Sequence, residues 1–181
     1  MNSRRRRTNP RTEGGAIAIE IERKFLVNGN SWRSGTTGQQ IRQGYLCSSA
    51  DRTVRVRVVD DRAFLTIKGA QQASHYEYEY GIPTRDAKEM LERLCERPLI
   101  EKTRHHLTVD GREWVVDEFE GENAGLMVAE VEFEKEGQAI ALPDWAGAEV
   151  TDEPRYLNVN LVRHPYRLWS SDERCPGRSG P

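Results

Sequence analysis

Polar and apolar residues alternate one by one along much of this 181-residue chain, and this alternation restricts the fold more than any other feature of the sequence. Successive side chains of a β-strand point to opposite faces of a sheet, so a period of two is typical of strands. We therefore expect a mainly β protein whose strands share one antiparallel sheet. Eight segments show the pattern: Ala16–Val27, Gln39–Leu46, Thr53–Val59, Ala63–Lys68, His75–Tyr80, Ile100–Val109, Arg112–Phe119 and Leu126–Glu134.

Turn and helix signals connect these segments. Asp110-Gly111 and Asp60-Asp61 are short enough to close hairpins between neighbouring strands. A helix is expected from Thr84, which has the side chain of an N-cap; apolar residues then recur at helical spacing, and Pro98 lies beyond the end. A second, short helix is predicted at Arg155–Val162.

The size and charge of the chain indicate one domain without a nucleic-acid or membrane partner. Its 27 basic and 29 acidic residues nearly balance, which argues against the broad basic face of a nucleic-acid-binding protein. No apolar run approaches the roughly 20 residues of a membrane-spanning helix, so we expect a cytoplasmic protein. The domain is predicted at residues 16–169, between disordered tails at 1–15, which is rich in arginine, and 170–181. The oligomeric state stays open between a monomer and a homodimer.

The polar positions of the alternating segments are densely ionised, and the two signs of charge fall on different segments. Acidic residues predominate on the first, fifth and eighth, and basic residues on the third and sixth. In a closed eight-stranded antiparallel barrel these groups would line opposing sectors of a polar tunnel, with the apolar side chains outward under flanking helices. Trp114 and Trp145 are expected to pack on that exterior against helices. A sheet with a salt-bridged solvent face, each pair contributing about 0.2–1 kcal/mol, is the alternative.

An interior of this kind suits a polyanion bound together with a divalent metal. Arginine offers forked donors to phosphate oxygens and lysine a point charge, while carboxylates hold Mg²⁺ or Mn²⁺. The sequence has no glycine-rich phosphate loop with its lysine and no nucleophile elbow. Side chains of the strands must therefore hold the phosphates.

An ordered series of short motifs between Ile19 and Leu161 resembles the CYTH domains, also called triphosphate tunnel metalloenzymes. The series begins with the E-x-E-x-K pattern of Glu20-Ile21-Glu22-Arg23-Lys24. It continues with Arg42-Gln43-Gly44-Tyr45, Arg55-Val56-Arg57, Thr66-Ile67-Lys68-Gly69, Tyr76-Glu77-Tyr78-Glu79, Lys102-Thr103-Arg104, Val116-Asp117-Glu118-Phe119, Ala129-Glu130-Val131-Glu132-Phe133 and Arg155-Tyr156-Leu157-Asn158. The chain is most similar to short bacterial members that resemble inorganic tripolyphosphatases. The resemblance implies an eight-stranded antiparallel tunnel and metal-dependent attack of water on a terminal phosphate.

The resemblance also assigns roles to individual residues. It implies that the metal ligands are Glu20, Glu22 and Glu132, with Glu130 and Asp117 close by. It implies that the phosphate chain is bound by Lys24, Arg55, Arg57, Lys68, Lys102 and Arg104, with Arg42 as a further addition. As a hypothesis for the mechanism, we expect a second metal ion, Glu77 or Glu79 to orient the attacking water, and Lys102 is the third candidate catalytic residue. The expected cofactor is Mg²⁺ or Mn²⁺.

The expected reaction is hydrolysis of the terminal phosphoanhydride of a linear triphosphate. Inorganic tripolyphosphate, cleaved to pyrophosphate and phosphate, is favoured because no constellation of aromatic and amide groups for a nucleobase is evident. Relatives with this fold act on nucleoside or thiamine triphosphates or are adenylate cyclases, so fold alone does not name the substrate. A non-catalytic module that binds polyphosphate or nucleotide is the alternative from another class. The short helix around Tyr156 is expected to cover one tunnel mouth.

Overall fold

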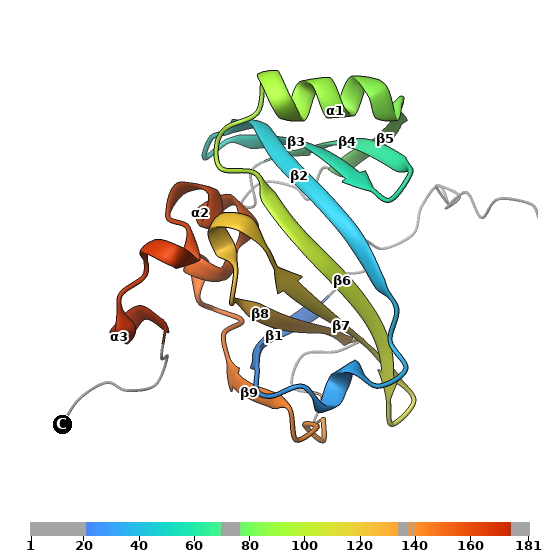
Figure 1. The fold of residues 1–181 in the computed structure, drawn as a ribbon, viewed down its shortest axis with the longest axis vertical. Helices are drawn as coiled ribbons and strands as arrows, with labels where there is room; N and C mark the ends of the chain where they lie inside the picture. The colour runs from blue at the N-terminus through green and yellow to red at the C-terminus, as the bar shows by residue number, and fades with distance from the viewer. Residues whose placement is uncertain (1–20, 70–76, 134–137, 139, 175–181) are drawn as a thin grey trace, which may run out of the picture.

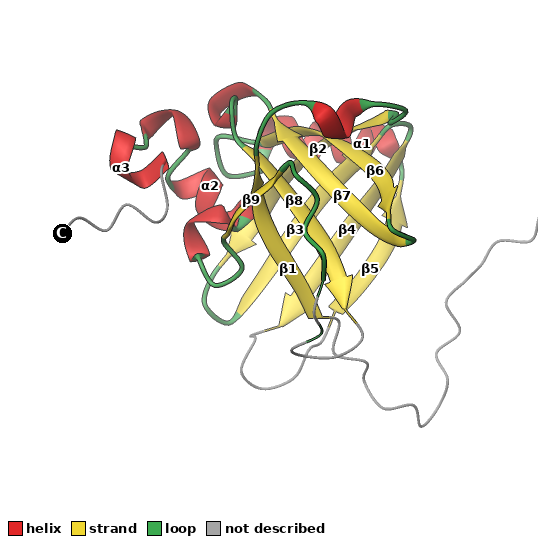
Figure 2. Ribbon diagram, turned by 90° about the horizontal axis from the view of Figure 1, so that it is seen from below, coloured by secondary structure: helices red, strands yellow, loops and turns green. Residues whose placement is uncertain are grey.

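In the computed structural model, which describes residues 21–69, 77–133, 138 and 140–174, one antiparallel sheet rolls around a common interior (Figures 1 and 2). Its strand order is β5-β4-β3-β2-β6-β7-β8-β1-β9. The strands are β1 (Ile21–Val27), β2 (Gly38–Ser48), β3 (Arg52–Val59), β4 (Arg62–Gly69), β5 (Glu77–Ile82), β6 (Ile100–Val109), β7 (Arg112–Phe119), β8 (Met127–Phe133) and β9 (Ala146–Glu149).

Each of the eight alternating segments contains a strand, and the segments predicted for β6 and β7 match the observed bounds. Residues 16–20, 75–76 and 134 of the predicted strands lie outside the described residues. Asp110-Gly111 forms the predicted hairpin turn, with φ values of 50° and 76° that suit a two-residue turn between twisted strands. Asp60-Asp61 likewise joins β3 to β4.

The prediction of a closed, eight-stranded barrel was wrong in two respects. A ninth strand, β9, pairs with β1, with Phe25 opposite Glu149 and Val27 opposite Ala146. Within the ranges that the structure describes, no ladder joins β5 to the other end of the sheet. The physical reason lies in β1, which gives one edge to β8 and the other to β9 and so has no edge left there for β5.

The helices differ from their predictions mainly at their ends. Helix α1 (Thr84–Arg93) begins at the predicted residue, but its N-cap is Pro83 and Thr84 Oγ1 donates to the carbonyl of Asp61 at 2.7 Å. The helix predicted at Arg155–Val162 is divided into η3 (Pro154–Tyr156) and α2 (Asn158–Arg163). The remaining short helices are η1 (Ser31–Arg33), η2 (Gly121–Asn123), η4 (Tyr166–Leu168) and α3 (Ser171–Arg174). Helix α3 lies in the segment 170–181 that was expected to be disordered.

Among the described residues, no helix is long and apolar enough to cross a membrane.

Two apolar clusters cover the outer face of the rolled sheet, as the alternation predicted. The first lies between α1 and strands β3 and β4, where Val56 and Ala63 pack against Ala87 and Leu91 (Figure 1). The second covers β1, β7 and β8. In this second cluster Trp114 packs against Trp145 and Phe25, with ring centroids 5.1 and 5.8 Å apart. Both tryptophans are therefore on the exterior as predicted, and they pack against each other in a cluster that also contains Trp32 of the short helix η1.

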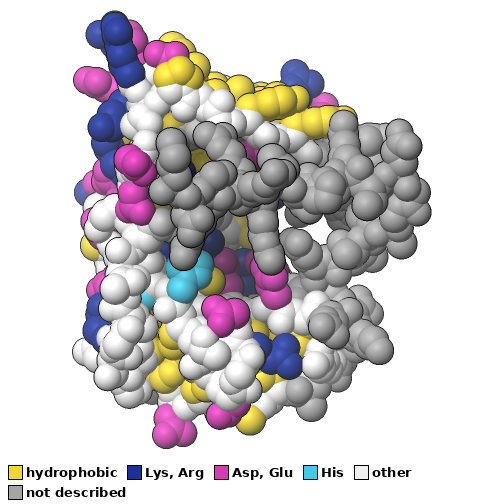
Figure 3. Space-filling model, turned by 90° about the vertical axis from the view of Figure 1, so that its right-hand side faces the viewer, with side chains coloured by type: hydrophobic (Ala, Val, Ile, Leu, Met, Phe, Trp, Pro, Cys, Tyr) yellow, Lys and Arg dark blue, Asp and Glu magenta, His cyan; other side chains and the backbone are white. Residues whose placement is uncertain are grey.

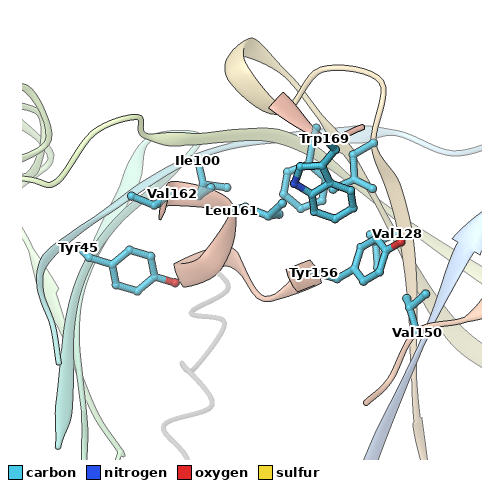
Figure 4. Close-up of a cluster of buried hydrophobic side chains, with 10 residues drawn as sticks. Tyr45, Ile100, Val128, Val150, Tyr156, Leu161, Val162 and Trp169 are labelled. Carbon is cyan, nitrogen blue, oxygen red and sulfur yellow. The ribbon is translucent and has the colours of Figure 1, made fainter. Parts of the chain in front are cut away.

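A third apolar cluster fills one end of the interior. Figure 4 shows α2 between Tyr45 on one side and Val128 and Val150 on the other, with Tyr156 and Trp169 nearby. Burying this many apolar side chains holds the C-terminal segment against the sheet, at about 25 cal/mol per Å² of buried surface. The expectation that the segment around Tyr156 covers one end of the tunnel agrees with this arrangement. It also means that the interior is polar over only part of its length.

Candidate functional site

A cavity of about 390 Å³ lies inside the rolled sheet and is lined by residues of β1, β2, β3, β4, β6, β7 and β8. Figure 3 shows basic and acidic side chains together in a recess on one face of the molecule. The lining contains six basic and three acidic side chains, so it carries an excess of positive charge. The basic residues are Lys24, Arg55, Arg57, Lys68, Lys102 and Arg104, and the acidic residues are Glu22, Asp117 and Glu130.

A continuous chain of ion pairs crosses the floor of this cavity from β6 to β1. Lys102 Nζ lies 2.5 Å from Asp117 Oδ2, and Arg104 donates to both Asp117 oxygens at 2.7 Å. Arg104 also donates to Glu130 at 3.1 Å, and Lys24 Nζ lies 2.6 Å from Glu130. These two positively charged side chains lie on opposite sides of β8, because Lys24 comes from the adjacent β1 and Arg104 from β6, beyond β7. Together they fix the Glu130 carboxylate between them.

Asp117 is the most deeply buried acid of this chain of ion pairs, with 1 % of its surface exposed, next to Lys102 with 2 %. Burial alone would raise the pKa of Asp117, but Lys102 and Arg104 outweigh burial and lower the pKa to about 2. Burial lowers the pKa of Lys102, against the attraction of Asp117. Both Asp117 oxygens already accept hydrogen bonds from these positively charged groups. The carboxylate therefore holds the side chains of Lys102 and Arg104 in place.

The opposite wall of the cavity is basic and less fully paired. Arg55 and Arg57 are on β3, and in the part of the chain that the structure describes the Nε atom of each is buried without a hydrogen-bond partner. Burial, and then repulsion from Arg55, lower the pKa of Arg57. The nearest acid is Glu79 on β5, at 3.1 Å from Arg57 and 3.6 Å from Arg55. An anion with several oxygens could accept the hydrogen bonds that these two guanidinium groups leave unmade.

Carboxylate side chains of β1 and β8 occupy opposed positions of the sheet at one edge of the site, although Glu132 is not among the residues that line the cavity. Glu22 lies directly opposite Glu132 in the sheet register, and Lys24 lies opposite Glu130. Like charges at directly opposed positions destabilise a sheet unless a cation lies between them; here Lys24 Nζ is 2.7 Å from Glu22. Carboxylate oxygens are also the donors that Mg²⁺ and Mn²⁺ prefer, so the residues present fit such an ion. The described residues contain no ready-made group of three or more such ligands, and Glu20 lies outside them.

The structure does not bring every predicted residue to the cavity. Arg42 is on the outer face of β2 and pairs with Glu101 at 2.9 Å, because it alternates with Ile41 and Gln43, which line the cavity. Glu77 and Glu79 lie on β5 beside the lining, where Glu77 pairs with Lys68 at 2.9 Å.

Sequence reasoning also missed several lining or supporting residues. Gln43 is 1 % exposed and lines the cavity, and Thr66 is fully buried between Arg55 and Glu79. The alternation of β2 contains the signal for Gln43, because Ile41, Gln43 and Tyr45 share one face. Leu157, which is part of the Arg155-Tyr156-Leu157-Asn158 motif, and Val159 line the cavity from the C-terminal segment, but the sequence predicted no such role for either residue.

Comparisons with known proteins agree with this geometry. The family model of the CYTH domain matches residues 18–166. The chain is 50% identical over 149 residues to an inorganic triphosphatase of Acetivibrio thermocellus, covering 82% of this chain and 96% of the relative. It is 39% identical over 148 residues to an inorganic triphosphatase of Nitrosomonas europaea, covering 79% and 96%. The crystal structure of the inorganic triphosphatase NE1496 superposes with a TM-score of 0.67 at 36% identity, covering 86% of this chain and 99% of that one. The chain belongs to the CYTH domain family.

Proposed function

We propose that this protein hydrolyses the terminal phosphoanhydride of a linear triphosphate, with inorganic tripolyphosphate as the substrate and pyrophosphate and phosphate as the products. The observation that carries the proposal is the cavity lining, whose six basic side chains exceed its three acidic ones and include two arginines with unmade hydrogen bonds. A compact anion with many oxygens satisfies both features. The relatives described above, which are inorganic triphosphatases, support the same reaction.

The two walls of the cavity divide the work of binding. Arg55 and Arg57 present forked donors from β3, and Lys68 adds a charge from the neighbouring strand β4. Arg104 and Lys102 face them from β6 in orientations that Asp117 fixes. Because these donors are in place before the substrate arrives, little reorganisation accompanies binding, and the phosphate chain is held in one alignment.

Mg²⁺ or Mn²⁺ is the proposed cofactor, held by Glu22 and Glu132 with Glu20, and with Glu130 next to them. Such an ion supplies charge neutralisation of the phosphate oxygens and makes a bound water more acidic. Each Glu130 oxygen accepts one hydrogen bond, from Lys24 or from Arg104, and 22 % of the side chain stays exposed. Asp117 is not part of the proposed ligand set, because it is 1 % exposed and its two oxygens accept three hydrogen bonds from Lys102 and Arg104.

The remaining chemistry is the orientation and deprotonation of the attacking water. Glu79 is the candidate for orienting that water, since it is the carboxylate nearest to the two arginines of the basic wall. Glu77, already paired with exposed Lys68, is the second candidate. Lys102 acts on the leaving group, where its positive charge offsets the charge that develops on the departing pyrophosphate.

Paired variants test this proposal. Glu22→Gln is expected to lower the rate of phosphate release from tripolyphosphate at least about tenfold with Mg²⁺ or Mn²⁺, since even changes around a metal site often cost about 10–100-fold. Glu101→Gln, which changes a carboxylate on the outer face, serves as its matched control. Arg57→Gln is expected to raise KM for tripolyphosphate, whereas Arg42→Gln on the outer face is not.

Product analysis separates the alternatives. The purified protein is incubated with tripolyphosphate, pyrophosphate, ATP and thiamine triphosphate, each with Mg²⁺ or Mn²⁺. Release of phosphate from tripolyphosphate above all others supports the proposal. A cyclic nucleotide from ATP would identify a cyclase, faster release from an organic triphosphate would change the substrate, and binding without any product would identify a non-catalytic module. Undiminished turnover by Glu22→Gln would overturn the metal assignment.

A further inference from the structure

A single buried hydroxyl, that of Thr66, lies between Arg55 of the basic wall and the neighbouring acid Glu79. Thr66 on β4 has no exposed surface. Its Oγ1 lies 3.1 Å from Arg55 Nη2 and 2.9 Å from Glu79 Oε2. A guanidinium only donates and a carboxylate only accepts, so the direction of both hydrogen bonds is fixed: Arg55 donates to Thr66, and Thr66 donates to Glu79.

The sheet register places these three residues in one straight row. Arg55 is directly opposite Thr66, and Thr66 is directly opposite Glu79, on three successive strands. Arg55 Nη2 and Glu79 Oε2 are 3.6 Å apart, which is beyond the range of a good hydrogen bond. The hydroxyl therefore stands between two charges that would otherwise attract each other directly.

The separation matters because direct contact would occupy the guanidinium. Arginine and a carboxylate readily form two parallel hydrogen bonds, and these use the same forked donors that bind phosphate. Glu79 has room to move toward Arg55, since it lies on β5, at one end of the sheet, with 36% of its side chain exposed. Arg57 holds it from the other side at 3.1 Å.

We propose that Thr66 is a positioning residue that keeps Glu79 away from Arg55, so that the Arg55 guanidinium stays available for a phosphate group. This inference rests on the proposed function and extends it to a residue that itself has no charge. In the absence of the hydroxyl, Arg55 and Glu79 close into a direct pair, and the basic wall loses one of its two forks. The loss falls on anion binding first and on the reaction only through binding.

Thr66→Val removes the hydroxyl and keeps the shape of the side chain, and Thr66→Ser keeps the hydroxyl. The measurement is calorimetric binding of tripolyphosphate in EDTA, so that metal plays no part, with the unfolding midpoint recorded for each variant. Thr66→Val is expected to raise Kd about tenfold, the scale of one lost hydrogen bond to a charged group, and Thr66→Ser to bind like the wild type. Thr103→Val is the matched control, because Thr103 accepts from Gln40 and donates to Glu120 on the outer face.

A double variant with Glu79→Gln distinguishes positioning by Thr66 from a purely structural role, because a structural role would change Kd equally with and without Glu79. In the Glu79→Gln background there is no carboxylate to close on Arg55, so adding Thr66→Val is expected to change Kd less than twofold. Equal effects in the two backgrounds, or a Thr66→Val protein that binds as tightly as the wild type, would overturn the role of Thr66. Wild-type binding without turnover would overturn the proposed function alone, and no wild-type binding would overturn both.

Discussion

Replacing Asp117 by asparagine should show how strongly the ion pairs under the cavity stabilise the fold. The lowering of the Asp117 pKa from 3.8 to about 2 corresponds to about 2 kcal/mol of stabilisation at neutral pH, at 1.36 kcal/mol for each pKa unit. The variant also leaves Lys102 buried without a negative partner, and breaking a buried pair typically costs about 3–5 kcal/mol. Because an amide oxygen can still accept one of the hydrogen bonds, we expect a loss of about 3 kcal/mol.

The assay is equilibrium unfolding in urea at pH 7 in EDTA, which removes any contribution of a metal. The double variant Asp117→Leu with Lys102→Met removes both charges and is expected to lose less stability than Asp117→Asn alone. Because the pKa of Asp117 is lowered in the folded protein, its contribution to the free energy of unfolding is present above about pH 4 and is lost as the pH falls toward 2. An Asp117→Asn protein within about 0.5 kcal/mol of the wild type would refute the reasoning.

Two further predictions concern the outer face. Burial lowers the pKa of His105, so its neutral form is favoured and the fold should lose stability as the pH falls below about 6.5. His105→Phe should therefore flatten the slope of the unfolding free energy between about pH 7 and 5, and an unchanged slope would contradict this role of His105. At Gly44 an added Cβ would lie 2.7 Å from Cys95 Cβ and 2.8 Å from Leu99 Cδ2, so Gly44→Ala should destabilise by about 1–3 kcal/mol in a thermal melt. An unchanged midpoint would show that the segment after α1, which holds Cys95 and Leu99, shifts freely.

The alternation of side chains predicted most of the fold because it records which face of each strand is buried. It placed Lys102 and Arg104 on one face and Trp114 on the other, and both placements are confirmed. It failed for β9, whose Ala-Gly-Ala-Glu sequence has neither alternation nor large apolar side chains. Closure of the sheet was mispredicted for the same reason, since this unrecognised strand takes an edge of β1.

Within the candidate site, the sequence indicated which residues are charged but not which of them meet. The family resemblance placed Asp117 among the candidate metal ligands, and only the register of β6 and β7 shows that Arg104 lies directly opposite it. Arg42 was selected by motif, although its position in β2 puts it on the outer face. The role of Thr66 depends on a row across three strands, which no local pattern contains.

The chain of ion pairs under the cavity also constrains how the protein folds. Lys24 and Glu130, which are 2.6 Å apart, are separated by 106 positions in the sequence, and Val159 still contributes to the cavity lining. Contacts of such long sequence separation form late and slowly, because the chain must lose the entropy of a large loop before they stabilise it. During synthesis, the cavity can therefore form around β1 only after nearly the whole described chain has emerged. Until then the apolar face of β1, which packs with β7 and β8, is exposed, and partial chains should depend on protection from aggregation.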